Sequence, residues 1–236
     1  MTLEGIRGVL LDLDGVLVYR EQAVPGAAEA LEALEARRVP YLVVTNASLV
    51  SRRGLAATGR RLGLHTPPER FHSALSATAA YTAARFPGQA LFVITSDDAA
   101  TEFASQRLVP AAEADAAPGA IAAVVLGDSP EALNRENLDV AFRCVRAGAA
   151  LVAMHRNPWW ATPAGPSLDL GAFLAGLEHA TGVRAAVVGK PSAPFFRFAI
   201  ARLRDEIVAA GGGRVRPGEL LMVGDDVWAD IRGAAR

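Results

Sequence analysis

The run Val9 to Leu17, Val-Leu-Leu-Asp-Leu-Asp-Gly-Val-Leu, constrains the fold of this 236-residue chain more than any other segment. Its apolar start is typical of a buried strand, and the strand ends in two carboxylates and a glycine. Asp12 and Asp14 repel each other unless a cation lies between them. The alternative interpretation is an ordinary Asp-Gly turn after a strand. Three further polar motifs downstream make that alternative the weaker one.

Short apolar runs alternate with longer segments of helical period along most of the chain. This alternation predicts βαβ units with a mostly parallel sheet, and therefore the α/β fold class. Among the helices we expect one over 27–36, one capped by Ser51 that runs to Arg61, and one with Pro194 in its first turn. The expected strands are 8–13, 41–45, 91–95, 122–126, 150–154, 185–188 and 220–223.

Polar groups follow four of the predicted strands: Asp12 to Gly15, Thr45-Asn46, Lys190 and Asp225. In an open parallel sheet, ligands bind at the carboxyl ends of the strands. The strands between about 90 and 154 are expected to carry no such set, which indicates an inserted domain. We therefore predict a Rossmann-like catalytic core over residues 1–73 and 184–236, with an α/β cap domain over 74–183 inserted into it.

Asp12 and Asp14 have the chemistry of a nucleophile and a proton carrier. A carboxylate such as Asp12 can attack phosphorus to form an aspartyl-phosphate that water later hydrolyses. Asp14, two residues further on, leans to the same side of the strand. It can protonate the leaving oxygen and then deprotonate the attacking water.

Mg²⁺ is the cofactor that these acidic groups predict. Asp12, the backbone carbonyl of Asp14 and Asp225 supply oxygen ligands, and water and a phosphate oxygen complete the octahedron of a small cation.

Phosphate binding is expected from groups at the same strand ends. Lys190 and the Thr45 hydroxyl can bind phosphate oxygens, together with backbone amides near Gly15 and Asn46.

In their order along the chain, these motifs resemble the four motifs of the haloacid dehalogenase-like superfamily of phosphatases: DxDGVL, TN, GKP and GDDxxxD. The segments 45–48, 188–192, 155–160 and 168–171 further resemble its class IIA branch, in which an α/β cap lies between the second and third motifs. That branch includes phosphatases for phosphoglycolate, 4-nitrophenyl phosphate, pyridoxal phosphate and phospholysine, phosphohistidine or pyrophosphate. The resemblance implies Mg²⁺, the roles given above for Asp12 and Asp14, and Asp225 as a metal ligand.

This chain departs from the class IIA pattern at two places. Ala47 stands where the branch commonly has a second asparagine, which affects substrate handling more than chemistry. The chain also stops at Arg236, inside the expected helix after the fourth motif, whereas the family continues through a further strand and helix. We expect the sequence to be truncated there.

Four other polar residues have a structural and a functional interpretation. Asp230 is expected to support the metal waters or Lys190 from behind. Asp226 is expected to cap the helix that begins near Val227. Ser48 fits a turn or a helix cap, and His155 at the end of a cap strand could reach a phosphate, although a lone histidine is more often structural.

Asn157, Trp159 and Trp160 follow a strand of the predicted cap. Exposed aromatic side chains are useful over a substrate and otherwise unfavourable. We expect this loop to bind the substrate; packing between cap and core is the alternative.

The composition narrows the partners of the chain. The net charge is −1 and no basic stripe occurs, so neither nucleic acid nor an anionic membrane is expected as a partner. No apolar run approaches the ~20 residues that span a bilayer. A single cysteine, Cys144, and a start unlike a signal peptide favour the cytoplasm. The resemblance also implies a homodimer formed through the cap.

The function predicted from the sequence is a Mg²⁺-dependent phosphatase acting on a small soluble phosphate. Two alternatives stay open. One is a phosphomutase; the other is a non-catalytic, receiver-like module that holds phosphate on an aspartate, although Asp14 as a second acid and the large insertion argue against a receiver.

Overall fold

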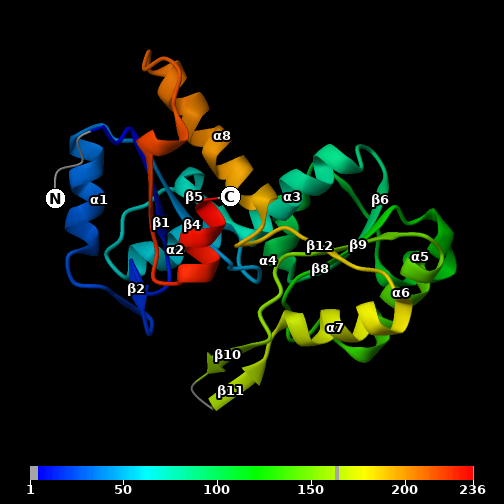
Figure 1. Ribbon diagram of the computed structural model, residues 1–236. Helices are drawn as coiled ribbons and strands as arrows, with labels where there is room; N and C mark the ends of the chain where they lie inside the picture. Colours follow the sequence, from blue (N-terminus) through cyan, green and yellow to red (C-terminus); the bar gives the residue numbers. More distant parts are fainter. Residues whose placement is uncertain (1–4, 163–164, 236) are drawn as a thin grey trace. The chain divides into compact units, whose positions relative to one another are not determined.

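The computed structural model describes residues 5–162 and 165–235 (Figure 1), and its contacts divide the chain into two units. The first unit comprises Met1–Thr45, Arg52–Ser73 and Lys190–Arg236. The second unit comprises Asn46–Ser51 and Ala74–Gly189. Arg236, where a truncated helix is expected from the sequence, lies outside the described residues.

A parallel sheet with the strand order β13-β1-β4-β5 forms the centre of the first unit. All five residues of β1 are buried, which is typical of a parallel strand covered on both faces. In the register of the sheet, Leu11 lies beside Val223, and Asp12 lies beside Val44. The strands are β1 (Gly8–Asp12), β4 (Tyr41–Thr45), β5 (Phe71–Ser73) and β13 (Leu220–Val223).

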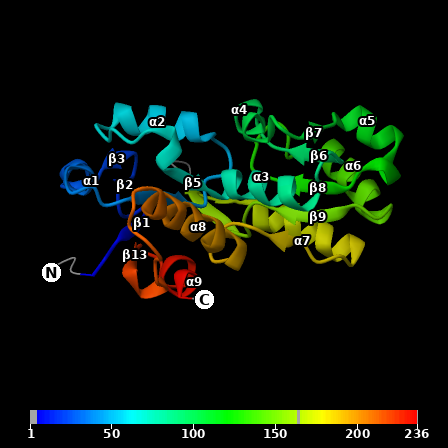
Figure 2. The ribbon, with the colours of Figure 1, turned by 90° about the horizontal axis from the view of Figure 1, so that it is seen from above.

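Helices cover both faces of this sheet. Val9, Leu11 and Val43 share a buried apolar cluster with residues of α1 and α2. On the opposite face, Leu203 and Ile207 of α8 lie against Gly8. Figure 2 shows α2 and α8 as separate layers. The helical segments are α1 (Ala27–Ala36), α2 (Arg52–Arg61), α8 (Ala193–Ala209), α9 (Arg232–Ala234), the π-helical turn η5 (Val227–Ile231) and the 3-10 turns η1 (Pro68–Arg70) and η4 (Pro217–Glu219).

A small hairpin follows β1 in the first unit. Strands β2 (Val18–Tyr19) and β3 (Gln22–Ala23) pair antiparallel. Arg20 and Glu21 between them both have positive φ, 48° and 61°, as a two-residue hairpin turn of type I′ requires. The sequence prediction missed this hairpin because Arg-Glu carries none of the Asn-Gly or Asp-Gly signal of such a turn.

The second unit contains a five-stranded sheet of its own, with the order β12-β9-β8-β6-β7 and parallel pairing throughout. Every residue of β8 is fully buried, so both faces of the sheet are covered. In Figure 1, α6 and α7 lie on one side of this sheet and α3 lies on the other. The strands are β6 (Ala90–Ile94), β7 (Arg107–Leu108), β8 (Ala123–Leu126), β9 (Ala150–Ala153) and β12 (Ala186–Val187).

The second unit also carries an exposed hairpin, β10 (Trp159–Thr162) paired with β11 (Gly165–Leu168). Helix α7 follows it directly, and the Asp169 side chain caps the start of that helix. The helical segments of this unit are α3 (Ala74–Arg85), α4 (Asp97–Ala100), α5 (Ala111–Ala116), α6 (Arg135–Arg146), α7 (Leu170–Thr181) and the 3-10 turns η2 (Thr101–Phe103) and η3 (Pro118–Ala120).

The predicted α/β class is confirmed, and each expected strand occurs within one or two residues of its expected bounds. Helix α1 begins and ends where the sequence predicts, and Pro194 lies in the first turn of α8. Two segments that were expected in the core lie in the second unit: residues 46–51, and residues 184–189, where β12 pairs with β9. Such a pairing depends on a partner more than 30 residues away, which local periodicity does not contain.

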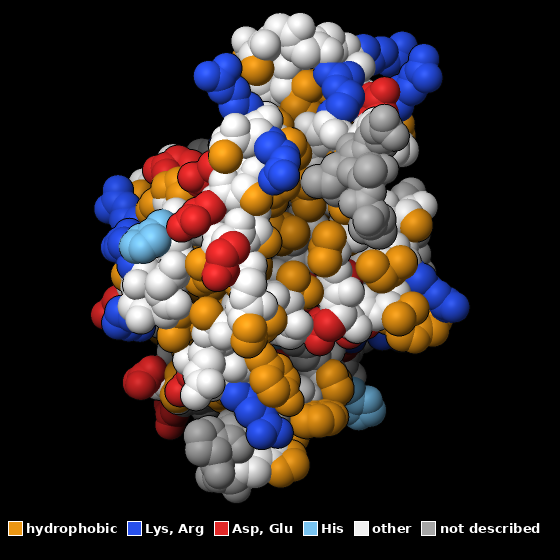
Figure 3. Space-filling model, turned by 90° about the vertical axis from the view of Figure 1, so that its left-hand side faces the viewer, with side chains coloured by type: hydrophobic (Ala, Val, Ile, Leu, Met, Phe, Trp, Pro, Cys, Tyr) orange, Lys and Arg blue, Asp and Glu red, His pale blue; other side chains and the backbone are white. Residues whose placement is uncertain are grey.

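Among the described residues, no helix combines the length and the apolar character needed to cross a membrane. On the face drawn in Figure 3, basic, acidic and apolar side chains are mixed.

Candidate active site

The carboxyl edge of the first-unit sheet carries the predicted reactive residues. Asp12 is the last residue of β1 and Thr45 the last of β4, while Asp225 follows two residues after β13. Because β13, β1 and β4 are parallel neighbours, these side chains leave the sheet at the same edge. The sequence prediction that the strand ends meet is thereby supported for these three residues.

Lys190 joins two carboxylates at this edge. Its Nζ lies 2.6 Å from Asp12 Oδ1 and 2.8 Å from Asp230 Oδ1. All three residues are buried, Asp230 completely. Charges removed from water in this way are stable only when they are paired and hydrogen-bonded. The backbone N–H of Leu13 also donates to Asp12 Oδ1 at 2.8 Å, so this oxygen is held in a fixed position.

Asp230 is held by both of its carboxylate oxygens. Oδ1 accepts from Lys190, and Oδ2 accepts from the backbone N–H of Asp226 at 3.2 Å. Gly224 packs so closely against Asp230 that a Cβ there would collide with its carboxylate. Asp230 therefore holds Lys190 in place, as the sequence predicts for a residue behind the site. Asp226 is the helix cap that was predicted: its Oδ1 accepts from the N–H groups of Trp228 and Ala229.

Gly15 is required by the approach of Asp225. Its φ is +82°, a conformation that favours glycine, and a Cβ at this position would overlap the Asp225 carboxylate. The Gly15 N–H donates to the Val18 carbonyl at 2.7 Å, closing the turn that leads into β2.

Asp14 lies at the open side of the site, with its residue exposed to solvent. The Thr45 hydroxyl donates to Asp14 Oδ2 at a long 3.5 Å. Desolvation by the protein atoms packed on its other side raises the pKa of Asp14 against the opposing effect of Lys190. A carboxyl group with a raised pKa retains its proton at higher pH, which suits a proton donor.

A cation fits the donor set of this edge. Carboxylate oxygens of Asp12, Asp225 and Asp230 all lie within 4.8 Å of one another. Burial raises the pKa of Asp12 to about 7, despite the hydrogen bond and charge of Lys190 and with the Asp230 charge adding to the rise. Lys190 alone therefore does not hold the pKa of Asp12 in its ordinary range, and a hard divalent cation bound by oxygen ligands would supply further positive charge.

The remaining predicted site residues belong to the second unit. Asn46 is the first residue of the second unit and lies beside Gly189. A Cβ at position 189 would closely approach Asn46 Oδ1. Asn157 is exposed, and its backbone carbonyl accepts from Gly171 N at 2.9 Å. Trp159 and Trp160 of β10 are 59% and 55% exposed. Such exposure does not fit the alternative in which both side chains are packed in an apolar core.

A second polar cluster, which we call the His155 cluster, consists of Ser48, Asp128, His155 and Asp169. Asp128 Oδ2 accepts from the Ser48 hydroxyl at 2.6 Å and lies 2.9 Å from His155 Nε2. The N–H of Asn157 donates to His155 Nδ1 at 3.4 Å, so Nδ1 acts as an acceptor and Nε2 is the nitrogen that faces Asp128.

The two acids of the His155 cluster have opposite pKa shifts. The pKa of Asp169 is raised, chiefly by burial. Burial opposes the shift of Asp128, but its pKa is lowered by the hydrogen bond and charge of His155 and by hydrogen bonds from Ser48 and Asp169. The ionised form is therefore favoured at Asp128 and disfavoured at Asp169.

The expectation that the inserted strands carry no polar set was wrong. Asp128 follows two residues after β8, and His155 follows two residues after β9. The sequence signal that could have revealed this polar set is the Gly127-Asp128 pair after an apolar run. Gly224-Asp225 shows the same pattern.

Comparisons with known proteins show what this chain is similar to. The family model described as haloacid dehalogenase-like hydrolase matches residues 9–108, and one described as HAD-hydrolase-like matches residues 187–236. Haloacid dehalogenase-like hydrolase domain-containing protein 2 of Rattus norvegicus is 34% identical over 97% of this chain and 80% of its own length. Phospholysine phosphohistidine inorganic pyrophosphate phosphatase of Bos taurus is 29% identical over 99% of this chain and 81% of its own.

Among solved structures, the glycerol phosphate phosphatase of Mycobacterium tuberculosis in complex with magnesium superposes with a TM-score of 0.84 and 29% identity. The match covers 99% of this chain and 66% of that one.

Proposed function

This chain belongs to the haloacid dehalogenase-like hydrolases, and from that premise we propose that it is a Mg²⁺-dependent phosphatase that acts through an aspartyl-phosphate on Asp12. The observation that carries the proposal is the buried Lys190 between Asp12 and Asp230. This arrangement fixes one oxygen of Asp12 and leaves the carboxylate within 4.8 Å of carboxylate oxygens of Asp225 and Asp230.

In the first chemical step, the free carboxylate oxygen of Asp12 attacks phosphorus and the bond from phosphorus to the leaving oxygen breaks. Asp14 gives its proton to that oxygen, which departs as an alcohol. The raised pKa of Asp14 supports this assignment, because it increases the fraction of the carboxyl that holds a proton.

In the second step, Asp14 takes a proton from water while the water oxygen attacks phosphorus. The bond between phosphorus and the Asp12 oxygen breaks, which restores the Asp12 carboxylate and releases inorganic phosphate. Asp14 is thereby returned to its protonated form.

Asp12, the backbone carbonyl of Asp14 and Asp225 are the groups proposed to hold Mg²⁺, with Asp230 supporting Lys190. When bound, the cation neutralises negative charge on the phosphate and on the acidic residues. Lys190, Thr45 and the backbone amides near Gly15 and Asn46 are proposed to bind the phosphate oxygens.

The exposed residues of the second unit are proposed to select the substrate. Asn157, Trp159 and Trp160 are open to solvent, and two neighbouring exposed tryptophans are unusual unless they bind something. A homodimer formed through the same unit is a further proposal. It is tested by the molecular mass in solution and by its change on Trp159→Ala.

The proposed substrate is a small phosphate, and the proposed location is the cytoplasm, in keeping with one buried, unpaired cysteine, Cys144.

Trapping of the phosphorylated protein tests this function. Asp14→Asn retains the nucleophile but lacks the base for the second step, so phosphate from 4-nitrophenyl phosphate should accumulate on Asp12 and be found there by mass spectrometry. The unaltered protein should turn over steadily with Mg²⁺ and stop in excess EDTA. Steady turnover in EDTA would contradict the metal requirement. Binding of at most one phosphate per chain without turnover would indicate a receiver-like module instead.

A further inference from the structure

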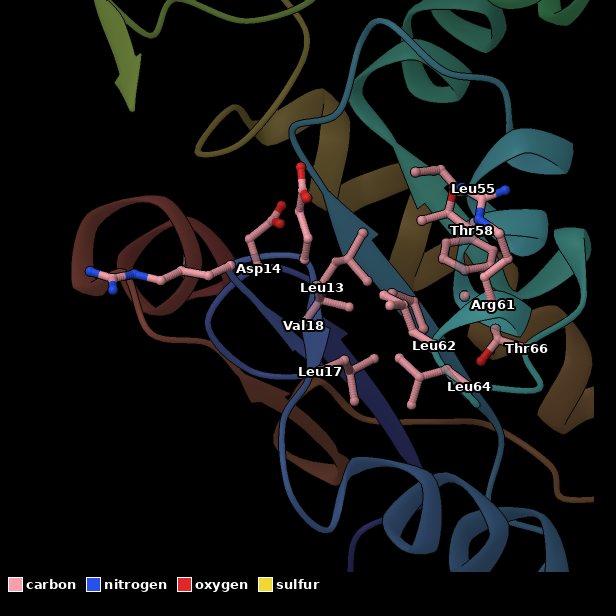
Figure 4. Close-up of a pocket in the computed structure, with 15 residues that line it drawn as sticks. Leu13, Asp14, Leu17, Val18, Leu55, Thr58, Arg61, Leu62, Leu64 and Thr66 are labelled. Atoms are coloured by element: carbon pink, nitrogen blue, oxygen red, sulfur yellow. Dashed lines mark hydrogen bonds between the residues drawn. The ribbon is translucent and has the colours of Figure 1, made fainter. Parts of the chain in front are cut away.

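A cavity of about 510 Å³ opens in the first unit, and Asp14 forms part of its wall. The cavity lies among the loop after β1, strands β2 and β4, and helix α2 with the residues that follow it. In Figure 4, the side chains of Leu13 and Leu17 face those of Leu62 and Leu64 across this space. Its volume is within the range of about 300–1,000 Å³ of small-molecule sites.

The buried wall of the cavity is mostly apolar, and Thr66 is a buried polar residue within it. Leu17, Val43, Leu64 and Phe71 line it, and each is almost completely buried. Val43 and Phe71 belong to neighbouring strands of the sheet, so this wall is part of a rigid element. A hydroxyl-rich group such as a sugar would lose its hydrogen bonds with water against these side chains, whereas an alkyl or aryl group would gain from leaving water.

The position of Asp14 relates the cavity to the chemistry. Under the proposed function, Asp14 protonates the oxygen of the departing alcohol and must lie within hydrogen-bond distance of it. A carbon chain attached to that oxygen therefore starts beside the cavity wall. Arg20 and Glu21 of the β2–β3 turn and Thr58 and Arg61 of α2 also line the cavity, and all four are exposed, so most polar lining residues other than Thr66 lie at the solvent.

We propose that this cavity binds the apolar part of the leaving alcohol, and hence that the substrates are phosphate monoesters of alkyl or aryl alcohols rather than of polyhydroxylated ones. The proposal rests on the proposed function, because it uses Asp14 as the proton donor. It adds a binding site formed by the first unit alone.

A series of n-alkyl phosphates tests the proposal on the unaltered protein with Mg²⁺. We expect kcat/KM to rise about fourfold for each added methylene, the factor that corresponds to burying one CH₂, and to level off when the cavity is full. n-Hexanol should inhibit turnover competitively and more strongly than ethanol. Equal kcat/KM values along the n-alkyl series, with equal inhibition by both alcohols, would overturn the cavity assignment and would not affect the phosphatase proposal. Failure to hydrolyse any phosphate ester would instead contradict the proposed function.

Two variants that introduce the same indole ring test whether the dependence of kcat/KM on chain length arises in the cavity. Leu62→Trp narrows the cavity, so the ratio of kcat/KM for hexyl phosphate to that for methyl phosphate should fall at least tenfold. Val208→Trp places the indole on an exposed position of α8, away from the cavity lining, and should leave the ratio unchanged. An unchanged ratio in folded Leu62→Trp would overturn the proposal. If Leu62→Trp does not fold, the alcohol inhibition of the unaltered protein decides.

Discussion

The carboxyl edges of the two parallel sheets both collect buried polar side chains, but they neutralise them differently. In the first unit, Lys190 provides a full positive charge between Asp12 and Asp230. In the second unit, the Ser48 hydroxyl and the His155 ring hydrogen-bond to Asp128, whose pKa is lowered, while burial raises the pKa of Asp169. The acids of the first edge are therefore joined by a lysine, whereas Asp128 of the second edge is held by a hydroxyl and a histidine ring.

This difference favours a chemical role for the carboxyl edge of the first-unit sheet and a structural role for that of the second-unit sheet. Burial raises the pKa of Asp12 to about 7 despite its lysine partner, so additional positive charge would stabilise the ionised form of Asp12. The His155 cluster joins the segment 46–51 to the ends of β8 and β9 and to the cap of α7. Asp128 Oδ2, His155 Nε2 and the Ser48 hydroxyl are bonded to one another, and Asp169 Oδ1 and His155 Nδ1 accept from backbone N–H groups, which favours a role in holding these segments together.

The largest expected effect is on turnover at the first edge. Asp12→Asn should lower kcat by more than ~10³-fold, because the amide has nearly the same shape but cannot attack phosphorus. The circular dichroism spectrum should not change. Asp226→Asn serves as the matched control, since asparagine also caps helices and should keep turnover within a few-fold. Turnover of Asp12→Asn within tenfold of the parent would contradict the nucleophile assignment.

Lys190→Met should cause the largest loss of stability. It leaves Asp12 and Asp230 buried without their cation, a change that typically costs about 3–5 kcal/mol. Urea unfolding measures the loss. His155→Leu in the second unit removes one hydrogen-bond partner of Asp128 and should cost only about 1–3 kcal/mol. Equal losses in the two variants would remove the distinction between the two edges.

The pH dependence of stability should differ between Asp169→Asn and the parent. Because the pKa of Asp169 is raised in the folded protein, proton binding at Asp169 stabilises the folded state. This stabilisation is complete below the ordinary carboxyl pKa of about 4. It is lost as the pH rises through the folded-state pKa. The amide introduced by Asp169→Asn does not ionise, so the stability of the variant relative to the parent should increase from pH 4 to pH 7.

Asp169→Ala is the matched control for this comparison. It also lacks the titrating group but loses the hydrogen bond from Leu170 N and the cap of α7, which costs about 1 kcal/mol at every pH. A stability difference between Asp169→Asn and the parent that does not change with pH would show that Asp169 titrates as an ordinary exposed carboxyl.

The smallest expected effect on stability is at the exposed hairpin. Trp159→Ala and Trp160→Ala should change the unfolding free energy by no more than about 0.5 kcal/mol, since both side chains are more than half exposed. If they select substrates, kcat/KM should change for bulky phosphates and hardly for the smallest. A fallen melting temperature with an unchanged ranking of substrates would show that they only pack.

Local patterns predicted the elements of the fold but not the pairing between distant ones. The apolar runs identified β1, β4 and β13, and Pro194 marked the start of α8. The hairpins β2–β3 and β10–β11 were missed because β2 and β3 have only two residues each and β11, Gly-Pro-Ser-Leu, contains no apolar run. The pairing of β12 with β9 depends on the inserted sheet as a whole.

The local pattern predicts which residues stand at the strand ends: Asp12, Asp14, Thr45 and Asp225 are recognisable because each follows an apolar run. How the charges of this edge are compensated depends on the folded structure. Lys190 meets Asp12 across 178 residues and Asp230 across 40, and Ser48 meets Asp128 across 80. Such contacts, and the resulting pKa shifts, depend on burial and on neighbours brought together by folding, which no local pattern encodes.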